Sequence, residues 1–478
     1  MRPNFRAISL SFLLVLIFSG PTSAADRPNV LMIAIDDLND WVGCLGGHPQ
    51  AKSPHIDRLA KRGLLFTNAH CQAPVCNPSR TSLMLGMRPS TTGIYVNRPW
   101  FRATPKNKDR VTLSQYFAAH GYRTLTTGKI YHASRVDGPS FQVVGPRPGQ
   151  RLKIDKQIVT DIGSSSRLWD FGPQQYDEKE FSDFVDASWA VEKLQTLKRQ
   201  KPFFLAVGFY RPHVPWYAPQ RFFDVRPRST VKLPVVRDDD RDDLSAGALT
   251  LTNNSLPPSH KWFVETDHWK DAVQSYLACV SFTDAQVGRL LDALDKSSHA
   301  DNTIVVLFSD HGFHLGEKQR WAKQSLWESS TRVPLIISVP GGKQGGRCSR
   351  PVELLHLYPT LLELCGLPAR DDLEGTSLGP LLKDSQAAWS RPAITTYQRN
   401  NHAVRSEHWR YIRYADETEE LYDHRSDPHE WMNLLSRGEG PSAQMKYQSV
   451  IAEHAKWLPA TNVPGATAME QKKKQQTN

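Results

Sequence analysis

The stretch NVLMIAIDD, residues 29–37, is an apolar run that stops abruptly at Asp36 and Asp37. A nearly continuous apolar run of this length is typical of a strand buried on both faces of a parallel sheet. Three further runs have the same form and also stop at polar residues: YRTLTT (122–127), PFFLAVGF (202–209) and TIVVLFS (303–309). Ligands of such sheets bind outside the carboxyl ends of the strands, so we expect these polar ends to face one crevice.

Amphipathic segments between these runs predict helices over residues 53–63, 112–121, 181–200 and 272–296. Strands that alternate with helices indicate a doubly wound α/β fold, with a mostly parallel sheet flanked by helices. Residues 140–180 and 225–270 are rich in Pro, Gly, Asp and Ser. We interpret them as long insertions that rim a substrate cleft.

The pattern changes near residue 385, beyond which segments 403–416 and 419–434 predict antiparallel strands and segment 445–458 a helix. The chain therefore divides into a catalytic α/β domain (25–385), a smaller C-terminal α+β subdomain (386–465) and a disordered basic tail (466–478). Residues 1–24 combine basic residues, a short apolar core and small residues, as in a cleaved signal peptide. We accordingly expect export to a periplasmic, extracellular or lysosome-like compartment.

The formal net charge is +10, which suits a polyanionic partner. An exported protein rarely meets nucleic acid, and no apolar run beyond residue 24 is long enough to span a bilayer. We therefore expect neither a nucleic-acid partner nor stable membrane insertion, and favour an acidic or sulfated saccharide. The alternative is that the excess charge is only surface lysine and arginine.

Six cysteines in an exported chain permit disulfides. They show no CxxC pairing, which disfavours a zinc–thiolate site. If Cys76 is reserved for chemistry, five remain and at least one cannot pair within the chain. Cys279 and Cys365 lie in helix-like apolar surroundings, where buried free thiols are the expected state.

Two acidic pairs follow predicted strands, Asp36-Asp37 after residues 29–35 and Asp310-His311 after residues 303–309. Three carboxylates brought together would repel one another unless a cation neutralised them. Oxygen ligands favour Ca²⁺ or Mg²⁺, while one imidazole leaves Mn²⁺ or Zn²⁺ open. The alternative for either pair alone is that its aspartate only caps a turn or helix.

The segment APVCNPSRTSL, residues 73–83, places Cys76 at the start of a predicted helix. Pro78 suits a first helical turn, and Arg80 lies one turn beyond Cys76 on the same face. A helix N-terminus with a nearby guanidinium stabilises an anion, either a thiolate or a bound sulfate or phosphate. The alternative is a small, buried cysteine without chemistry.

Four more candidates are two lysines and two histidines that follow predicted strands or lie near the second acidic pair. Lysines can neutralise charge on a transferring sulfuryl or phosphoryl group, and histidines can move protons near neutral pH. Each alone is more often a structural histidine or a solvated lysine, and it is their repeated placement that indicates a site. The candidates are Lys129, His132, His213 and Lys323.

Eight segments of this sequence together resemble type I sulfatases, and the resemblance is strongest to the iduronate-2-sulfatase branch. The resemblance runs in order from about residue 29 to about residue 434, and its Cys-x-Pro-Ser-Arg element is highly specific. It implies an alkaline-phosphatase-like fold and the hydrolysis of sulfate esters. The segments are NVLMIAIDDLND, SPHIDRLAKRGLLFTNAHCQAPVCNPSRTSLMLGMRPSTTGIY, GKIYH, RPHVPW, SDHGFHLGEKQRWAKQSLWE, VPLIISVPG, LYPTLLELCGLP and ELYDHRSDPHEWMNL.

The resemblance also implies why a cysteine lies beside a site for a hard cation. In this family the cysteine is oxidised after translation to formylglycine by a formylglycine-generating enzyme, and a hydrate oxygen of that aldehyde joins the metal ligands in place of sulfur. By this analogy Cys76 would be the precursor of the nucleophile. Its hydrate oxygen, together with Asp36, Asp37, Asp310 and His311, would bind one Ca²⁺.

The remaining candidates take roles by the same analogy. Arg80 and the metal would favour a deprotonated hydrate oxygen that attacks the sulfur of a sulfate ester in line. Lys129, Lys323 and His213 would hold the sulfate oxygens, with His213 as the proton donor to the leaving alcohol. His132 would accept the proton whose removal expels sulfate and regenerates the aldehyde.

Three positions mark how this chain differs within the family. Lys318-Gln319 follows LGE where many relatives have His-Gly, so substrate contacts of relatives in this segment do not transfer. His356 stands where Asp is frequent, which we interpret as a packing difference. His311, where many sulfatases carry Asn, favours the iduronate-2-sulfatase-like branch, and no motif names a sugar, a linkage position or an oligomeric state.

Two other functions compete with a sulfatase. A phosphatase of the alkaline phosphatase superfamily would use Ser or Thr with a zinc-rich ligand set, but a formylglycine-dependent phosphonate or phosphate monoester hydrolase would share this set of residues. A non-catalytic binder of acidic glycans would need only the basic surface. Release of inorganic sulfate separates these alternatives.

Overall fold

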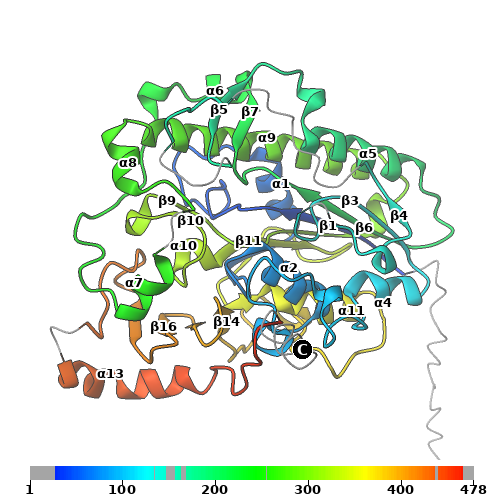
Figure 1. Cartoon of the computed structure of the whole chain (residues 1–478). Helices are drawn as coiled ribbons and strands as arrows, with labels where there is room; N and C mark the ends of the chain where they lie inside the picture. The colour runs from blue at the N-terminus through cyan, green and yellow to red at the C-terminus, as the bar shows by residue number, and fades with distance from the viewer. Residues whose placement is uncertain are drawn as a thin grey trace, which may run out of the picture.

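The computed structural model describes residues 27–133, 135–146, 157–162, 168–253, 256–436 and 440–466, the last segment without side chains for 440–443. The expected signal peptide, 1–24, and all of the expected tail except residue 466 lie outside the described residues. A nine-stranded mixed sheet forms the centre of the molecule, in the order β12-β2-β11-β8-β1-β6-β3-β4 with β13 beside β2 (Figure 1).

Strand β1 (Asn29–Ile35) lies in the middle of this sheet, parallel to β6 (Phe203–Phe209) on one side and β8 (Thr303–Ser309) on the other. Every residue of the three strands is buried, as their apolar runs predict. Strand β3 (Arg123–Gly128) continues the parallel part beyond β6, next to β4 (Val143–Val144). The predicted doubly wound, mostly parallel sheet is confirmed.

Helices cover both faces of the sheet, because alternate residues of a strand point to opposite sides. Leu31, Ile33 and Ile35 join a core with residues of α1, α5 and α9, whereas Val30, Met32 and Ala34 join a second core with residues of α2, α4 and α11 (Figure 1). The bounds of these helices are α1 Pro54–Arg62, α2 Cys76–Leu85, α4 Leu113–Ala119, α5 Ser182–Thr196, α9 Trp269–Asp295 and α11 Leu357–Leu364.

One strand of this sheet runs antiparallel to its neighbours. Strand β11 (Arg332–Ser338) runs opposite to both β8 and β2 (Leu64–His70). It therefore begins at the sheet edge where β1 and β8 end, and brings the segment before it to that edge. Minor elements are α3 (Pro89–Thr92), α6 (Gln220–Asp224), α10 (Glu328–Thr331), α12 (Gly379–Lys383), β12 (Gly346–Cys348) and β13 (Val352–Glu353).

A four-stranded antiparallel sheet forms the C-terminal part, followed by α13 (Gly440–Ala455). It docks on the main domain close to the start of α2, since Thr396 N–H donates to the Gln72 carbonyl at 2.8 Å and the Thr395 hydroxyl to the Cys71 carbonyl at 2.6 Å. The strands are β14 (Ala393–Thr396), β15 (His402–Arg405), β16 (Trp409–Arg413) and β17 (Glu419–Asp423).

The two long insertions carry elements of their own. Within the described residues of 140–180, β5 (Phe171–Gln174) pairs with β7 (Trp216–Pro219), and 225–270 contains α7 (Ala246–Thr252) and α8 (His260–Glu265). Beyond α9, β9 (His314–Leu315) and β10 (Trp321–Ala322) form a short hairpin beside the site. None of the described helices has the length and apolar character that crossing a membrane requires.

Candidate active site

Four acidic-pair residues meet at the carboxyl edge of the sheet. Asp36 and Asp37 follow β1, and Asp310 and His311 follow its neighbour β8. The backbone turns sharply at Asp37, whose φ is 63°, and the Asp37 N–H donates to Asp310 Oδ1 at 3.2 Å. His311 Nε2 lies 3.4 Å from Asp37 Oδ1 and 3.5 Å from Asp310 Oδ2.

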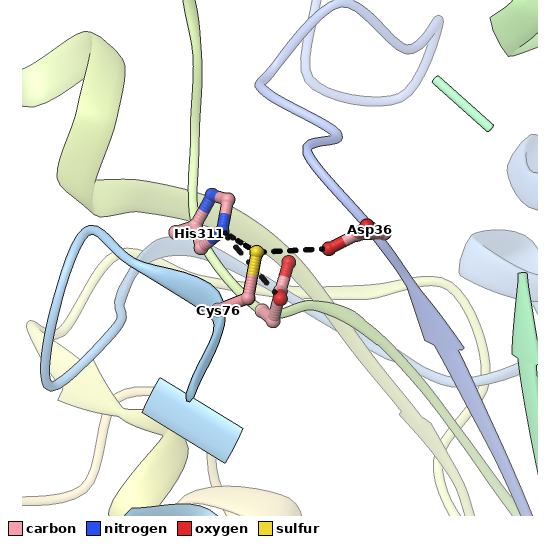
Figure 2. Close-up of side chains that lie close together, drawn as sticks. Asp36, Cys76 and His311 are labelled. Carbon is pink, nitrogen blue, oxygen red and sulfur yellow. Dashed lines mark hydrogen bonds and ion pairs between the residues drawn. The ribbon is translucent and has the colours of Figure 1, made fainter. Parts of the chain in front are cut away.

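Cys76 is the first residue of α2 and points its thiol into this cluster (Figure 2). Its Sγ lies 3.5 Å from Asp36 Oδ1 and 3.3 Å from His311 Nε2. The Nζ atoms of Lys323 and Lys129 lie 3.3 Å and 3.8 Å from the same sulfur. A helix N-terminus and two ammonium groups thus converge on the side chain at position 76.

Arg80 joins the helix to the carboxylates from the same face as Cys76. Its Nε donates to Asp310 Oδ2 at 2.7 Å and its Nη2 to Asp36 Oδ1 at 3.2 Å. The guanidinium is only 3% exposed and also donates to the Lys129 and Ile130 carbonyls. Arg80 therefore fixes the relative positions of α2, β1 and β8, in addition to supplying positive charge.

The lysines arrive from different elements and each pairs with one aspartate. Lys129 follows β3 and binds Asp36 Oδ2, while Lys323 follows β10 and binds Asp37 Oδ1. Strands β3 and β6 approach closely enough at Gly128 and Gly208 that a Cβ on Gly128 would lie 1.9 Å from the Gly208 carbonyl oxygen. Glycine at both positions is what lets Lys129 reach the site.

The charges in this buried cluster shift the acidity of its members. Burial and Asp36 raise the pKa of Cys76, but the positive charges of Lys129, Lys323 and His311 lower it by more. The pKa of Cys76 therefore lies well below its ordinary value. Burial lowers the pKa of His311, yet the neighbouring Asp310 raises it to about 9. The surroundings of residue 76 therefore stabilise a negative charge on its side chain.

The residues present fit a divalent cation. Burial raises the pKa of Asp37 to about 7, opposed by Lys323, and Asp37 Oδ2 is a buried atom that accepts no hydrogen bond among the described residues. An unpartnered buried carboxylate oxygen beside two further carboxylates is a donor set that a hard cation would satisfy. One atom each of Asp36, Cys76, Asp310 and His311 lies within 4.8 Å of the others, as do Asp36, Asp37, Cys76 and His213.

The two remaining histidines differ in placement. His213 follows β6, its Nδ1 donates to the Val214 carbonyl at 2.5 Å, and its Nε2 lies 4.0 Å from carboxylate oxygens of both Asp36 and Asp37. His132 is half-buried, and no hydrogen bond or ion pair joins it to the cluster in the described part of the chain. The structure thus gathers nine of the ten candidates around one point, and His132 is the candidate without a hydrogen bond or ion pair to them among the described residues.

Several supporting residues were not recognised from the sequence. The Ser79 hydroxyl donates to the Asp310 carbonyl at 2.6 Å, and the Tyr276 hydroxyl to the Asp37 carbonyl at 2.8 Å. Asp183 on α5 accepts from the Tyr210 and Arg211 N–H groups at 2.8 and 2.9 Å, which fixes the turn before His213. Ser79 belongs to the Cys-x-Pro-Ser-Arg motif and could have been found there, whereas Tyr276 and Asp183 lie on helices without a local signal.

The departures from the family pattern have structural explanations. Lys318 is buried, and its Nζ donates to Asp240 Oδ1 at 2.8 Å and to the Glu430 carbonyl, which ties the loop after β9 to the insertion and to the C-terminal part. His356 is buried against Trp389, and its Nδ1 accepts from the Thr376 N–H at 3.0 Å. All six cysteines are free thiols, with Cys279 and Cys365 buried.

Comparison with known proteins identifies the family. The Sulfatase family model matches residues 28–367, and the model described as N-sulphoglucosamine sulphohydrolase, C-terminal, matches residues 316–456. A sulfatase of Formosa agariphila is 41% identical over 91% of this chain and 87% of its own length. Iduronate 2-sulfatase of Homo sapiens is 34% identical over 72% of this chain and 70% of its own length.

Solved structures share the fold at lower identity. BT4656, in complex with its substrate D-glucosamine-2-N,6-O-disulfate, is 21% identical and superposes with a TM-score of 0.71 over 91% of this chain and 99% of its own. The phosphonate monoester hydrolase of Agrobacterium radiobacter, also 21% identical, gives 0.74 over 90% and 95%. On the family-model match and the similarity to the Formosa agariphila protein, the chain belongs to the sulfatase family and is a sulfuric ester hydrolase.

Proposed function

We propose that this protein is an exported sulfatase that hydrolyses sulfate esters of a saccharide, in the manner of an iduronate 2-sulfatase, with Cys76 as the precursor of a formylglycine nucleophile. The observation that carries the proposal is the convergence of Lys323, Lys129, His311 and the start of α2 on Cys76 Sγ. The sulfated sugar named for BT4656 and the likeness to human iduronate 2-sulfatase support a saccharide substrate. The basic, leader-like N-terminal sequence supports export.

Each residue of the cluster has a task in this reaction. Asp36, Asp37, Asp310 and His311 would hold a divalent cation, which we propose to be Ca²⁺, and that cation supplies charge neutralisation beside position 76. Lys129 and Lys323 lie where they can bind the oxygens of a sulfate ester and stabilise the charge that develops during transfer. Arg80 orients the carboxylates, and His213 Nε2 faces the site, where it can hydrogen-bond the departing alcohol.

The test is sulfate release from 4-nitrocatechol sulfate by protein produced with and without a formylglycine-generating enzyme. We expect release only from the co-produced protein, and none from Cys76→Ala. Mass spectrometry of the peptide that contains residue 76 should show loss of the thiol in the active sample. Full activity with an unconverted Cys76, or hydrolysis of phenyl phosphonate monoesters in preference to all sulfate esters, would overturn the proposal.

A further inference from the structure

A cavity of about 620 Å³ lies beside the β9–β10 hairpin and has no role in the chemistry at Cys76. Its lining comes from the hairpin and from the insertion 225–270, and includes the side chains of two arginines and a histidine: Arg241, Arg320 and His260. No aspartate or glutamate lines it among the described residues. The cavity is thus positively charged, although the chain around it is rich in acidic residues.

Arg320 is a charged residue in this cavity that is buried without an acidic partner among the described residues. Its side chain is only 6% exposed, and within the described chain it forms no ion pair. Its Nη atoms donate only to the backbone carbonyls of Thr252 and Lys323, and its buried Nε has no partner. A buried guanidinium without a counter-charge is costly, because its hydration is lost and two neutral carbonyl groups replace it only in part.

A second arginine makes this cost larger. Burial, reinforced by the positive charge of Arg241, lowers the pKa of Arg320 to about 10. Arg241 itself is half-buried, with a single long contact of 3.5 Å from Nη1 to the Lys318 carbonyl and no ion pair among the described residues. Two like charges held together around a cavity are an arrangement that an anion would relieve.

The position of Arg320 connects the cavity to the reacting centre. Arg320 and Lys323 are three residues apart, so their Cα atoms lie at most about 11 Å from each other. Arg320 Nη2 donates to the Lys323 carbonyl at 3.4 Å, while Lys323 Nζ lies 3.3 Å from Cys76 Sγ. One short segment thus contributes Arg320 to the cavity and Lys323 to the reacting centre.

The backbone around these two residues is also strained, which is typical of segments held for function. Four non-glycine residues within seven positions have positive φ values: Lys318 at 53°, Gln319 at 51°, Ala322 at 73° and Gln324 at 74°. The buried ion pair between Lys318 and Asp240 holds one end of this segment in place. This strained segment is held in the conformation that carries both Arg320 and Lys323.

We propose that Arg320 and Arg241 form a subsite for a second anionic group, a carboxylate or a sulfate ester, on the same saccharide whose sulfate ester reacts at Cys76. This inference rests on the proposed function and narrows the substrate to a sugar with at least two negative charges. A guanidinium fork matches the paired oxygens of either group.

The experiment compares substrates that differ by one charge. Two pairs separate the two sources of that charge: D-glucosamine-2-N,6-O-disulfate against N-acetyl-D-glucosamine-6-O-sulfate, and a 2-O-sulfated hexuronate against the matching 2-O-sulfated hexose. Binding is measured by calorimetry with the otherwise intact Cys76→Ala protein, which requires no turnover. We expect tighter binding of the dianionic member in at least one pair, and the pair that responds identifies the group.

Arginine variants then assign the effect. In the Cys76→Ala background, Arg320→Gln should weaken binding of the preferred dianionic sugar by about 10- to 100-fold more than binding of its monoanionic partner. Arg241→Gln should act in the same direction, and Arg320→Lys should lose less than Arg320→Gln because it keeps the charge. The matched control is Arg221→Gln, an exposed arginine paired with Glu178 on the surface, which should change neither affinity.

The binding and activity measurements can contradict the subsite and the proposed function independently. Three results would overturn the inference. They are equal affinity for both sugars of each pair, no binding of any of the four sugars, and an equal loss of affinity for both sugars of a pair in Arg320→Gln. Absence of sulfate release from every substrate by the converted wild-type enzyme would instead overturn the proposed function. Even in that case, Cys76→Ala could still bind the dianionic sugar more tightly, and Arg320→Gln could remove this difference. The subsite and the sulfatase activity are therefore tested separately.

Discussion

His132 is the predicted site residue that lies outside the hydrogen-bonded cluster around Cys76. Its Nδ1 is buried without a partner in the described chain, so the ring has an unused proton-binding atom. We expect His132→Ala to slow steady-state turnover by about 10²- to 10⁴-fold, the usual worth of a positioned acid or base. Release of the alcohol in the first turnover should remain fast, because Lys129, Lys323 and His213 are unchanged.

Rapid-quench kinetics with an aryl sulfate would measure both phases. His120→Ala serves as the control, since His120 lies at the end of α4 with its Nδ1 bonded to the Tyr116 carbonyl. If His132→Ala turns over at the wild-type rate, the residue has no part in the reaction.

His356 gives the molecule a source of acid lability. Burial lowers the pKa of His356 from its ordinary value near 6.5 to about 4. The unfolded chain therefore binds a proton at a pH where the folded one does not, and stability present above about pH 6.5 is lost as the pH falls toward 4. The full effect amounts to roughly 3 kcal/mol.

His356→Asn keeps an acceptor for the Thr376 N–H but removes the titrating ring. Urea unfolding between pH 4 and 7 should show a shallower loss of stability for this variant than for the wild type, whatever its stability at neutral pH. Replacement of the exposed His408 by Asn should leave the slope unchanged. A parallel pH dependence for His356→Asn and wild type would show that another group is responsible.

At the scale of elements, the meeting of β3 and β6 determines where Lys129 lies. Gly128 has a φ of 69°, and an added Cβ would lie 1.9 Å from the Gly208 carbonyl oxygen. Gly128→Ala should cost about 2–4 kcal/mol, from backbone conformation and from separation of the strands, and should also lower activity by displacing Lys129.

Gly121→Ala is the matched control, because Gly121 also has a positive φ, 89°, but has no atom within 4 Å of an added Cβ. It should cost only the conformational part, about 1–2 kcal/mol, and leave activity intact. Chemical denaturation and aryl sulfate hydrolysis measure the two effects. Equal loss of stability in both variants would mean that close approach of the strands is unimportant.

Elements differed in how far the sequence predicted them. The strands β1, β6 and β8 were predicted within one residue, because burial on both faces leaves an uninterrupted apolar run. Strands β2 and β11 were not predicted, since polar residues and Pro334 interrupt their apolar character and only their mutual pairing makes them strands. Pairing between segments more than 250 residues apart leaves no local pattern.

The site shows the same division. Asp36, Cys76 and Asp310 follow elements with strong local signals, so their convergence could be anticipated from strand and helix ends. Arg320 carries no such signal, because its surroundings depend on how residues 241–253 and 256–260 lie beside the β9–β10 hairpin.

At the scale of the whole molecule, Arg410 on β16 connects the C-terminal part to the active-site segment. Its fully buried guanidinium binds Glu328 and Glu430 and donates to the Leu326 carbonyl at 2.9 Å. Leu326 lies three residues beyond Lys323. We expect Arg410→Met to cost about 3–5 kcal/mol, because Glu328 and Glu430 would lose the guanidinium that bridges them and keep only Arg405 and His424 as counter-charges.

Denaturant unfolding measures this loss, and activity should fall with it as the segment around Lys323 loosens. Arg413→Met, on the same strand and partly exposed, should change stability by no more than about 0.5 kcal/mol. If Arg410→Met is as stable as the wild type, the ion pairs of Arg410 do not contribute to holding the C-terminal part against the active-site segment.

The hydrogen bonds from Thr395 and Thr396 to Cys71 and Gln72 also impose an order in time. In the finished fold Cys76 is 1% exposed, but the strand that braces the segment before it is synthesised 320 residues later. At ordinary rates of synthesis that delay is roughly 15 to 60 seconds. For this interval the growing chain presents Cys76 without these hydrogen bonds, so the enzyme that we propose converts this residue would meet it before the C-terminal strands are in place.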